Sequence, residues 1–218
     1  MIITFEGPDS AGKSTQANIL YEKLKKKGLK VKLFHFPRYE SPIGEFIGKV
    51  LQNDDMEVDF TALQMLYVAD QLDFSVEAKK LLEDGYILIL DRYDLSTIAY
   101  YIAKTKCDIN KSIRIVKSWQ KFILKPDITF IFDAKHRISD RRKLETLDKI
   151  EKDKSIMDHI NNIYQSLRYI DDREIYSIDA SLSIENIADQ IEKNLRGGIL
   201  CTKPIIQLLN GNLESNII

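Results

Sequence analysis

A glycine-rich segment near the start of the chain constrains the fold more than any other feature. Residues 7–14 read Gly-Pro-Asp-Ser-Ala-Gly-Lys-Ser, which fits the pattern G-x-x-x-x-G-K-S/T. The segment follows a short apolar run, Ile2 to Phe5, and precedes the helical pattern of residues 15–27. This strand–loop–helix context allows backbone amides at a helix N-terminus to surround a phosphate. The chain is therefore predicted to bind a nucleoside triphosphate.

The residue types within this loop each suit a phosphate. The glycines let the backbone curve around it, Lys13 neutralises the transferring phosphates, and Ser14 can ligate Mg²⁺ directly or through water. The predicted ATP-binding residues are Gly7, Pro8, Asp9, Ser10, Ala11, Gly12, Lys13, Ser14 and Thr15.

Short apolar runs alternate with helical patterns along the rest of the chain. The predicted strands are 2–5, 31–35, 86–90, 128–132 and 174–178. The predicted helices are 15–27, 43–51, 59–83, 95–103, 111–123 and 184–195, with a charged, interrupted helical stretch over 135–166. Strands separated by helices in this way form a parallel sheet wound on both sides. We expect an α/β fold, a P-loop three-layer sandwich in which helices flank a five-stranded parallel sheet.

The chain is expected to form one main domain. Of its 218 residues 44% are apolar, and a chain of this length can bury a full core without disulfide or metal staples. No shift in composition divides it until Gly197 and Gly198 end the regular pattern. The predicted organisation is a domain over 1–196 and a tail over 197–218 whose order the sequence leaves open.

Charge and cysteine usage exclude several classes of partner. The 32 basic residues balance 33 acidic ones, so no overall basic field attracts nucleic acid. Cys107 and Cys201 lie far apart without metal-type spacing, which is typical of free thiols in a reducing compartment. The first residues lack a signal-peptide pattern, and no apolar run reaches the roughly 20 residues that span a bilayer. We expect a cytoplasmic protein without a nucleic-acid or membrane partner.

Charged side chains follow two of the predicted strands. Strand 86–90 leads into Asp91, Arg92 and Tyr93, and strand 31–35 leads towards Arg38. Ligands of open α/β sheets gather beyond the carboxyl ends of the strands, so these side chains are placed to meet a substrate. Asp91 can hold Mg²⁺, directly or through water, and each arginine can form bidentate contacts with a phosphate. The sequence therefore predicts a second phosphate site beside the first.

A second phosphate site favours a small-molecule kinase over other nucleotide-binding proteins. The base-reading N-K-x-D segment of GTPases is not found in this sequence. The chain is also shorter than most ATPases of larger assemblies. In phosphoryl transfer the protein mainly places charged groups around the phosphates. The aspartate and arginines at these strand ends are groups of that kind.

Four segments together resemble thymidylate kinases. They are F-E-G-x-D-x-x-G-K-S-T at 5–15, F-P-R-Y at 36–39, D-R-Y at 91–93 and P-D-I-T-F-I-F-D at 126–133. The match runs in register from Met1 to about Leu195. The resemblance implies Mg²⁺- and ATP-dependent phosphorylation of dTMP to dTDP in dTTP biosynthesis. It also implies a homodimer and a helical lid at about 137–152.

The resemblance assigns roles at the phosphate end of the site. The aspartate at the position of Asp9 approaches the 3′-hydroxyl of the acceptor sugar in this family. Arg38 and Arg92 match arginines that clamp the acceptor phosphate and steady the transferring one. The predicted catalytic residues are Lys13, Arg38, Asp91, Arg92, Arg137, Arg141 and Arg142.

The resemblance also assigns a base pocket. Tyr67, Gln71 and Phe74 are spaced so as to share one helix face, and Tyr67 matches the aromatic residue that stacks on thymine. Thr97 and Tyr100 match positions that face the base and crowd the 2′ position of the sugar. Gln71 departs from the usual arginine; its amide can donate but brings no charge, which leaves the base selectivity open. The predicted substrate-binding residues are Asp9, Phe36, Pro37, Arg38, Tyr39, Tyr67, Gln71, Arg92, Thr97 and Tyr100.

The lid is expected to supply positive charge. Some relatives carry an arginine within the phosphate loop where this chain has Ser10, and members without it supply arginines from the lid. Arg137 and Arg141 are one helical turn apart and Arg142 follows, whereas Lys149 stands where the family often has another arginine. We expect the lid arginines to close over ATP and exclude water.

Three alternatives remain open from the sequence. The first is a kinase for another nucleoside monophosphate, such as dUMP. The second is a deoxynucleoside kinase, for which Glu6 at the end of the first strand would be the general base. Arg38 together with Arg92 favours an acceptor that already carries a phosphate. The third is a P-loop nucleotide switch that has lost turnover.

Overall fold

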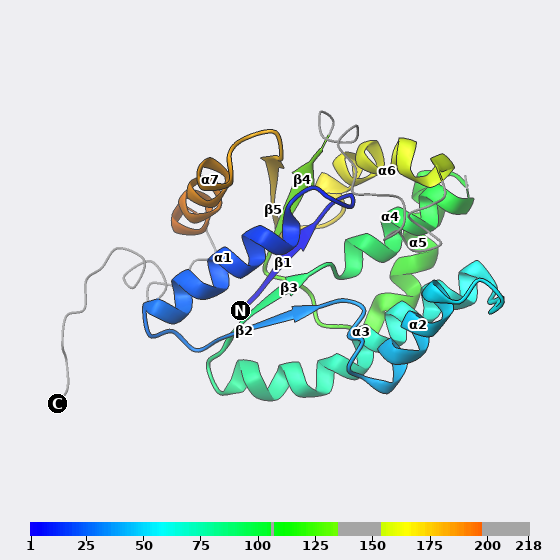
Figure 1. Cartoon of the computed structure of the whole chain (residues 1–218), viewed down its shortest axis with the longest axis horizontal. Coiled ribbons are helices and arrows are strands. Elements are labelled where there is room, and N and C mark those ends of the chain that lie inside the picture. Colours follow the sequence, from blue (N-terminus) through cyan, green and yellow to red (C-terminus); the bar gives the residue numbers. More distant parts are fainter. Residues whose placement is uncertain (106, 135–153, 198–218) are drawn as a thin grey trace.

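The computed structural model describes residues 1–105, 107–134 and 154–197 (Figure 1). Strands alternate with helices over these ranges. In chain order the elements are β1 (Ile2–Glu6), α1 (Lys13–Lys26), β2 (Val31–His35), α2 (Pro42–Gln52), α3 (Phe60–Glu83), β3 (Ile87–Asp91), α4 (Asp94–Thr105), α5 (Ile109–Trp119), η1 (Gln120–Phe122), β4 (Ile128–Asp133), α6 (Lys154–Ser166), η3 (Leu167–Tyr169), β5 (Glu174–Asp179) and α7 (Ile184–Gly197).

The strands form one parallel sheet in the order β2-β3-β1-β4-β5. β1 lies at the centre, where Ile3 is level with Ile89 of β3 and with Ile128 of β4. Every residue of β1 and β3 is buried, as expected for strands of a parallel sheet covered on both faces. The predicted five-stranded parallel sheet is confirmed.

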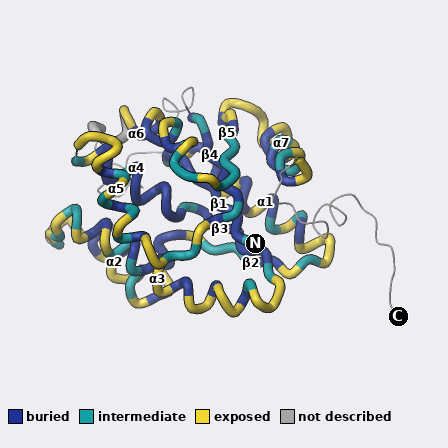
Figure 2. The backbone as a smooth tube through the Cα atoms, turned by 180° about the vertical axis from the view of Figure 1, so that it is seen from behind, coloured by how far each residue is buried: buried dark blue, intermediate teal, exposed yellow. Residues whose placement is uncertain are grey.

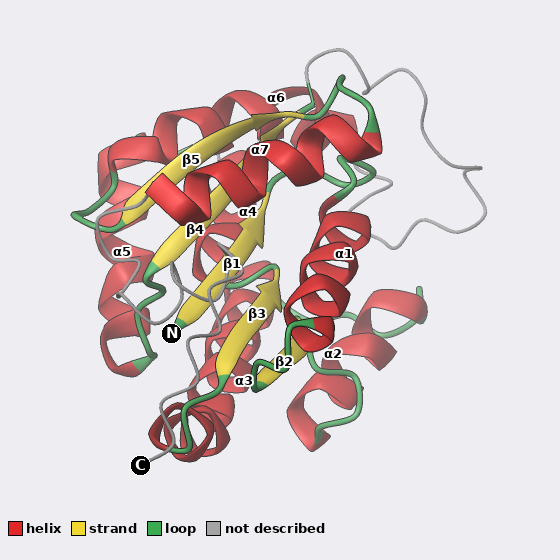
Figure 3. Ribbon diagram, turned by 90° about the vertical axis from the view of Figure 1, so that its left-hand side faces the viewer, coloured by secondary structure: helices red, strands yellow, loops and turns green. Residues whose placement is uncertain are grey.

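Helices cover both faces of this sheet (Figure 3). α1 and α7 pack on one face, where Leu20 and Ile191 join a core that includes Phe5. α3, α4 and α6 cover the other face, against residues such as Leu88 and Ile131. Figure 2 shows buried residues along the central strands and alternating buried and exposed positions along α3. The apolar period of each helix thus decides which side turns to the sheet.

The segments that carry the predicted site leave the same edge of the sheet. Asp91 at the end of β3 is level with Phe5 of β1 and with His35 of β2. The loop after β1 and the segments after β2 and β3 therefore begin side by side. Tertiary structure brings together site residues that are distant in the chain, such as Asp9 and Tyr100, which are 91 positions apart.

Most element bounds agree with the predicted ones to within two residues. α1 begins at Lys13 because the lysine of the phosphate loop already belongs to the first helical turn. The predicted helix 111–123 instead begins at Ile109, where the Asp108 side chain accepts a hydrogen bond from the Lys111 amide, and its end is a separate 3-10 helix.

The end of the predicted domain is only partly described. α7 continues to Gly197, one residue past the expected boundary. Of the charged stretch predicted over 135–166, α6 covers 154–166. The predicted lid and the tail from residue 198 onward lie outside the described residues. Among the helices that are described, none is long and apolar enough to cross a membrane.

Candidate active site

The loop after β1 has the backbone shape of a phosphate cradle. Gly7 has φ of +138°, and a Cβ there would lie 2.9 Å from the carbonyl oxygen of Phe132 on β4. Ser10 and Gly12 also have positive φ, of 62° and 91°. Left-handed residues turn successive amides toward one side, where an anion can bind. Lys13 is buried and lies across the loop, donating to the carbonyl of Pro8 at 2.7 Å.

Asp91, at the end of β3, lies beside Lys13 and Ser14 of the phosphate loop. Burial raises its pKa, but the hydrogen bond with His35 and the charge of Lys13 outweigh this, so the pKa stays below its ordinary value. Its Oδ2 lies 3.0 Å from Nδ1 of His35, whereas the buried Oδ1 has no hydrogen-bond partner among the described residues. An ionised, half-satisfied carboxylate beside Ser14 fits Mg²⁺, which takes one or two protein ligands and keeps several waters. No cluster of three His, Cys, Asp or Glu side chains that could hold a metal ion occurs in the described part of the chain.

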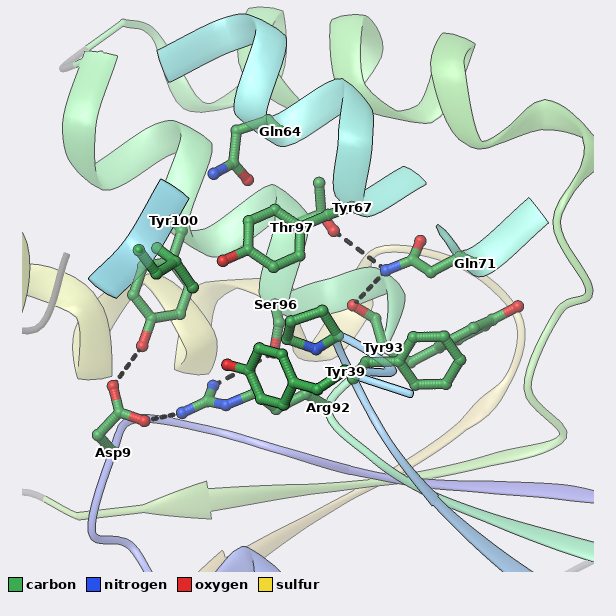
Figure 4. Close-up of a pocket in the computed structure, with 13 residues that line it drawn as sticks. Asp9, Tyr39, Gln64, Tyr67, Gln71, Arg92, Tyr93, Ser96, Thr97 and Tyr100 are labelled. Atoms are coloured by element: carbon green, nitrogen blue, oxygen red, sulfur yellow. Dashed lines mark hydrogen bonds and ion pairs between the residues drawn. The ribbon is translucent and has the colours of Figure 1, made fainter. Parts of the chain in front are cut away.

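Arg92, Asp9 and Tyr100 converge from three elements (Figure 4). Arg92 adopts a φ of +65°, an uncommon conformation for a non-glycine residue and one that clusters at functional sites. Its guanidinium pairs with Asp9 and also donates to the carbonyl of Gly7 at 3.2 Å. The Tyr100 hydroxyl donates to the other oxygen of Asp9 at 2.7 Å. A carboxylate and a guanidinium are thus held in fixed positions beside the phosphate loop.

These three residues form one end of a pocket. Nine of the ten predicted substrate-binding residues line it: Asp9, Phe36, Pro37, Tyr39, Tyr67, Gln71, Arg92, Thr97 and Tyr100. Phe74, which shares the helix face of Tyr67 in sequence, is fully buried between the rings of Phe34 and Phe36 and belongs to the core.

Three lining residues were not predicted from the sequence: Leu51, Gln64 and Ser96. Tyr93 was expected to face a substrate from the end of its strand, although it was not among the predicted substrate-binding residues, and it lines the pocket. Gln64 lies three residues before Tyr67 and seven before Gln71 on α3, so the helical period could have found it. Leu51 comes from α2, and no sequence signal linked that helix to the site.

Arg38 is the predicted substrate residue that does not line this pocket. Its Nε donates to Oδ1 of Asp70 at 3.0 Å, and its Nη2 donates to Oδ2 of Asp73 at 2.6 Å. Asp70 also accepts from the backbone amide of Arg38 and from the Ser41 hydroxyl. The guanidinium is therefore anchored on α3, and its contact with a phosphate stays a prediction.

Gln71 uses its amide in a way that the sequence did not predict. Its Nε2 donates to the carbonyl of Tyr93 at 3.0 Å and to the Thr97 hydroxyl at 3.2 Å. Because a carbonyl can only accept, this contact fixes which end of the amide faces α4. Its Oε1 is buried without a partner among the described residues. Gln71 therefore offers the pocket an acceptor, whereas we expected a donor.

Glu6 occupies a structural position between β1 and α4. Its Oε1 accepts from the backbone amides of Tyr93 and Leu95, at 2.9 and 3.1 Å, and its Oε2 accepts from the Ser96 hydroxyl at 2.5 Å. Complete burial and then the nearby charge of Asp94 raise the pKa of Glu6 to about 7. Since Glu6 does not line the pocket and both its oxygens are engaged, the geometry does not favour a general base there.

The remaining predicted site residues divide into two groups. Pro8, Ser10, Ala11, Ser14 and Thr15 all lie in the loop or at the start of α1. Arg137, Arg141 and Arg142 lie outside the described residues.

The phosphate cradle and the pocket open on the same sheet edge, with Arg92 hydrogen-bonded to the loop and lining the pocket. A donor phosphate in the loop can thus face a second ligand in the pocket, which is the arrangement of a P-loop nucleoside monophosphate kinase. A thymidylate kinase family model matches residues 5–191. The chain belongs to the thymidylate kinase family.

Individual relatives agree with this assignment. A thymidylate kinase of Exiguobacterium sp. is 33% identical over 211 residues, which cover 91% of this chain and 98% of that protein. The thymidylate kinase of Plasmodium falciparum is 29% identical over 201 residues, or 88% of each chain. The solved structure of the Candida albicans thymidylate kinase superposes with a TM-score of 0.76 at 26% identity, covering 90% of this chain and 91% of that one.

Proposed function

We propose that this protein phosphorylates dTMP to dTDP with ATP and Mg²⁺, as a step of dTTP biosynthesis. The observation that carries the proposal is the pocket, which joins a charged end at Asp9 and Arg92 to an aromatic and amide end at Tyr67 and Gln71. A deoxynucleoside monophosphate has the same division into phosphate, sugar and base. Family membership supports the same substrate.

The protein contributes position and charge to the transfer. A phosphate oxygen of dTMP attacks the γ-phosphorus of ATP, the bond to the β-phosphate oxygen breaks, and ADP leaves. Lys13 neutralises the transferring group, and Arg92 donates to the acceptor phosphate. Ser14 and Asp91 would hold Mg²⁺, which screens the phosphate charge when bound. No side chain forms a covalent bond.

The sugar is selected at Asp9 and Tyr100. The Asp9 carboxylate is an acceptor for a 3′-hydroxyl, and the hydrogen bond from Tyr100 orients it. A nucleotide bound with its 3′-hydroxyl at Asp9 would have the 2′ position of its sugar against the Tyr100 ring. A deoxyribonucleotide with a free 3′-hydroxyl is therefore the preferred acceptor.

We also propose a homodimer, with α3 at the interface. Met65, Leu72 and Val76 lie on one side of α3, and their exposed fractions are 47%, 43% and 64%. Exposed apolar residues aligned along one helix are typical of a protein–protein contact. A cytoplasmic location and the absence of nucleic-acid and membrane partners stay predictions from the sequence.

Release of ADP tests the proposal directly. The protein with ATP and Mg²⁺ is supplied with dTMP, dUMP, UMP, dCMP, dGMP, AMP or thymidine. We expect the highest kcat/KM with dTMP and loss of turnover in Lys13→Met with the fold intact. Faster turnover of another monophosphate would overturn the assignment of thymine. Binding of ATP without turnover of any acceptor would instead indicate a nucleotide switch.

A further inference from the structure

Gln64 on α3 is a buried amide for which the described ranges of the chain provide no hydrogen-bond partner. Only 1% of its surface is exposed, and neither its Nε2 nor its Oε1 has a hydrogen-bond partner among the described residues. An amide buried in this state destabilises the folded protein, because both groups have lost their hydrogen bonds to water. Such a group in a native structure needs an explanation.

The place of Gln64 in the molecule indicates what its partner is. The residue lines the same pocket as Asp9 and Arg92 and lies one helical turn before Tyr67. In Figure 4 it lies at the end of the pocket away from Asp9 and Arg92. If the acceptor phosphate and sugar lie near those two residues, the other end receives the base.

The two glutamines of this end offer complementary atoms. Gln71 presents only Oε1, because its Nε2 is committed to Tyr93 and Thr97. Neither end of the Gln64 amide is hydrogen-bonded to the part of the chain that the structure describes, so a bound ligand decides which end faces it. The edge of thymine or uracil carries one N–H between two carbonyl oxygens. Gln71 can therefore accept from the ring N–H while Gln64 donates to a neighbouring carbonyl.

We propose that Gln64 is a specificity-determining residue that donates a hydrogen bond from Nε2 to a ring carbonyl of the acceptor base. The inference rests on the proposed function, because it takes the pocket as the acceptor site. It differs from that proposal in naming a residue that the family resemblance did not assign. The 5-methyl group of thymine takes no part in this contact, so Gln64 acts equally on dTMP and dUMP.

The proposal predicts opposite effects on stability and on binding. Gln64→Met keeps the length of the side chain and removes both unpaired polar atoms. The protein without ligand should become more stable, with a melting temperature higher by about 3 °C. Binding of dTMP should weaken by about five- to tenfold, the loss expected for one hydrogen bond. A residue that serves only the core would not give this combination.

Calorimetric titration of Gln64→Met with dTMP, dUMP and ATP tests the predicted changes in Kd. We expect equal losses of affinity for dTMP and dUMP, an unchanged Kd for ATP, and a higher KM for dTMP with a similar kcat. Gln165→Met is the control, because the Nε2 of Gln165 also has no partner within residues 1–105, 107–134 and 154–197, but Gln165 lies on α6 and does not line the pocket. It should leave every Kd unchanged. An unchanged Kd for dTMP in Gln64→Met, or an equal loss for ATP, would overturn the proposal.

Thio-substituted nucleotides test the atom that Gln64 contacts. Sulfur is a weak acceptor, so either 2-thio-dTMP or 4-thio-dTMP should bind the wild-type protein several-fold more weakly than dTMP does. This difference should disappear in Gln64→Met. The same difference in both proteins would rule out the contact.

These results remain distinguishable from a failure of the proposed function. A wild-type protein that binds no nucleoside monophosphate overturns both proposals. If the wild-type protein prefers another monophosphate and Gln64→Met weakens the binding of that nucleotide as well, only the thymine assignment is overturned.

Discussion

Single side chains in this site are placed by partners far away in the sequence. Tyr100 of α4 orients Asp9 of the phosphate loop, and Arg92 pairs with the same carboxylate. The Gln71 amide is oriented by Tyr93 and Thr97. The orientation of Asp9 and of the Gln71 amide therefore depends on hydrogen bonds that no sequence motif encodes.

Tyr100 is expected to control discrimination between deoxyribose and ribose. Tyr100→Ala removes the ring that crowds the 2′ position, so kcat/KM for ribothymidine monophosphate should approach the value for dTMP. Tyr100→Phe keeps the ring and should keep the preference, with a decrease of about tenfold or less in kcat/KM from the lost hydrogen bond to Asp9. Equal preferences in the two variants would show that the ring does not exclude ribose.

Glu6 is expected to make stability depend on pH. Its pKa is about 7 in the folded protein and 4.5 in the unfolded reference, so between these values only the folded state holds the proton. The free energy of unfolding should therefore decrease as pH rises from 4.5 to 7, by about 3 kcal/mol, and level off above. Glu6→Gln should remove this component, as judged from urea midpoints at pH 5 and pH 8. Parallel pH profiles of variant and wild type would contradict the prediction.

Elements around the site are joined by buried ion pairs as well as by apolar packing. The N-terminus of α4 is joined to the segment just before β5, because Arg173 donates to both oxygens of Asp94, at 3.0 and 2.6 Å. Asp171 flanks the same guanidinium, and burial of Arg173 and Asp94 is nearly complete. Since α4 carries Thr97 and Tyr100, this pair also supports the pocket.

Loss of Arg173 should be strongly destabilising. Arg173→Met leaves the buried carboxylate of Asp94 unpaired, which costs on the order of 3–5 kcal/mol of unfolding free energy. Lys49→Met removes an exposed partner of Glu45 at 2.7 Å and should cost less than about 1 kcal/mol. Denaturant titration measures both. A loss below 1 kcal/mol for Arg173→Met would show that the pair contributes little net stability.

On the scale of the whole molecule, the exposed side of α3 opposes the pocket side of the same helix. Tyr67 and Gln71 line the pocket, whereas Leu72 and Val76 are exposed. A contact between two copies through α3 would therefore rigidify the helix that forms the base end of the site.

The dimer is tested by light scattering of the eluting protein. We expect twice the mass of the 218-residue chain for the wild type and a shift to the monomer for Val76→Glu, because a charge in an apolar interface is costly. Tyr169→Glu changes an exposed residue of η3 and should leave the mass unchanged. A wild-type monomer would contradict the proposed assembly.

Local physics allowed much of this protein to be predicted from its sequence. The strand–loop–helix around Gly7 and Lys13 and the five strands follow from backbone freedom and from periodicity, which depend on neighbours within a few residues. The substrate-binding residues were predicted from the resemblance to thymidylate kinases, and nine of those ten line the pocket.

Tertiary structure alone decided how the polar atoms are paired. It anchors Arg38 on Asp70 and Asp73, engages Glu6 at the start of α4 and reverses the expected role of Gln71. It also leaves the Gln64 amide without a hydrogen bond to any described residue. A hydrogen bond depends on the distance and direction between two groups, which segments distant in sequence acquire only when the chain has packed. The sequence by itself therefore determined the fold and the kind of site, whereas the packed structure decided which atoms are left to meet the ligand.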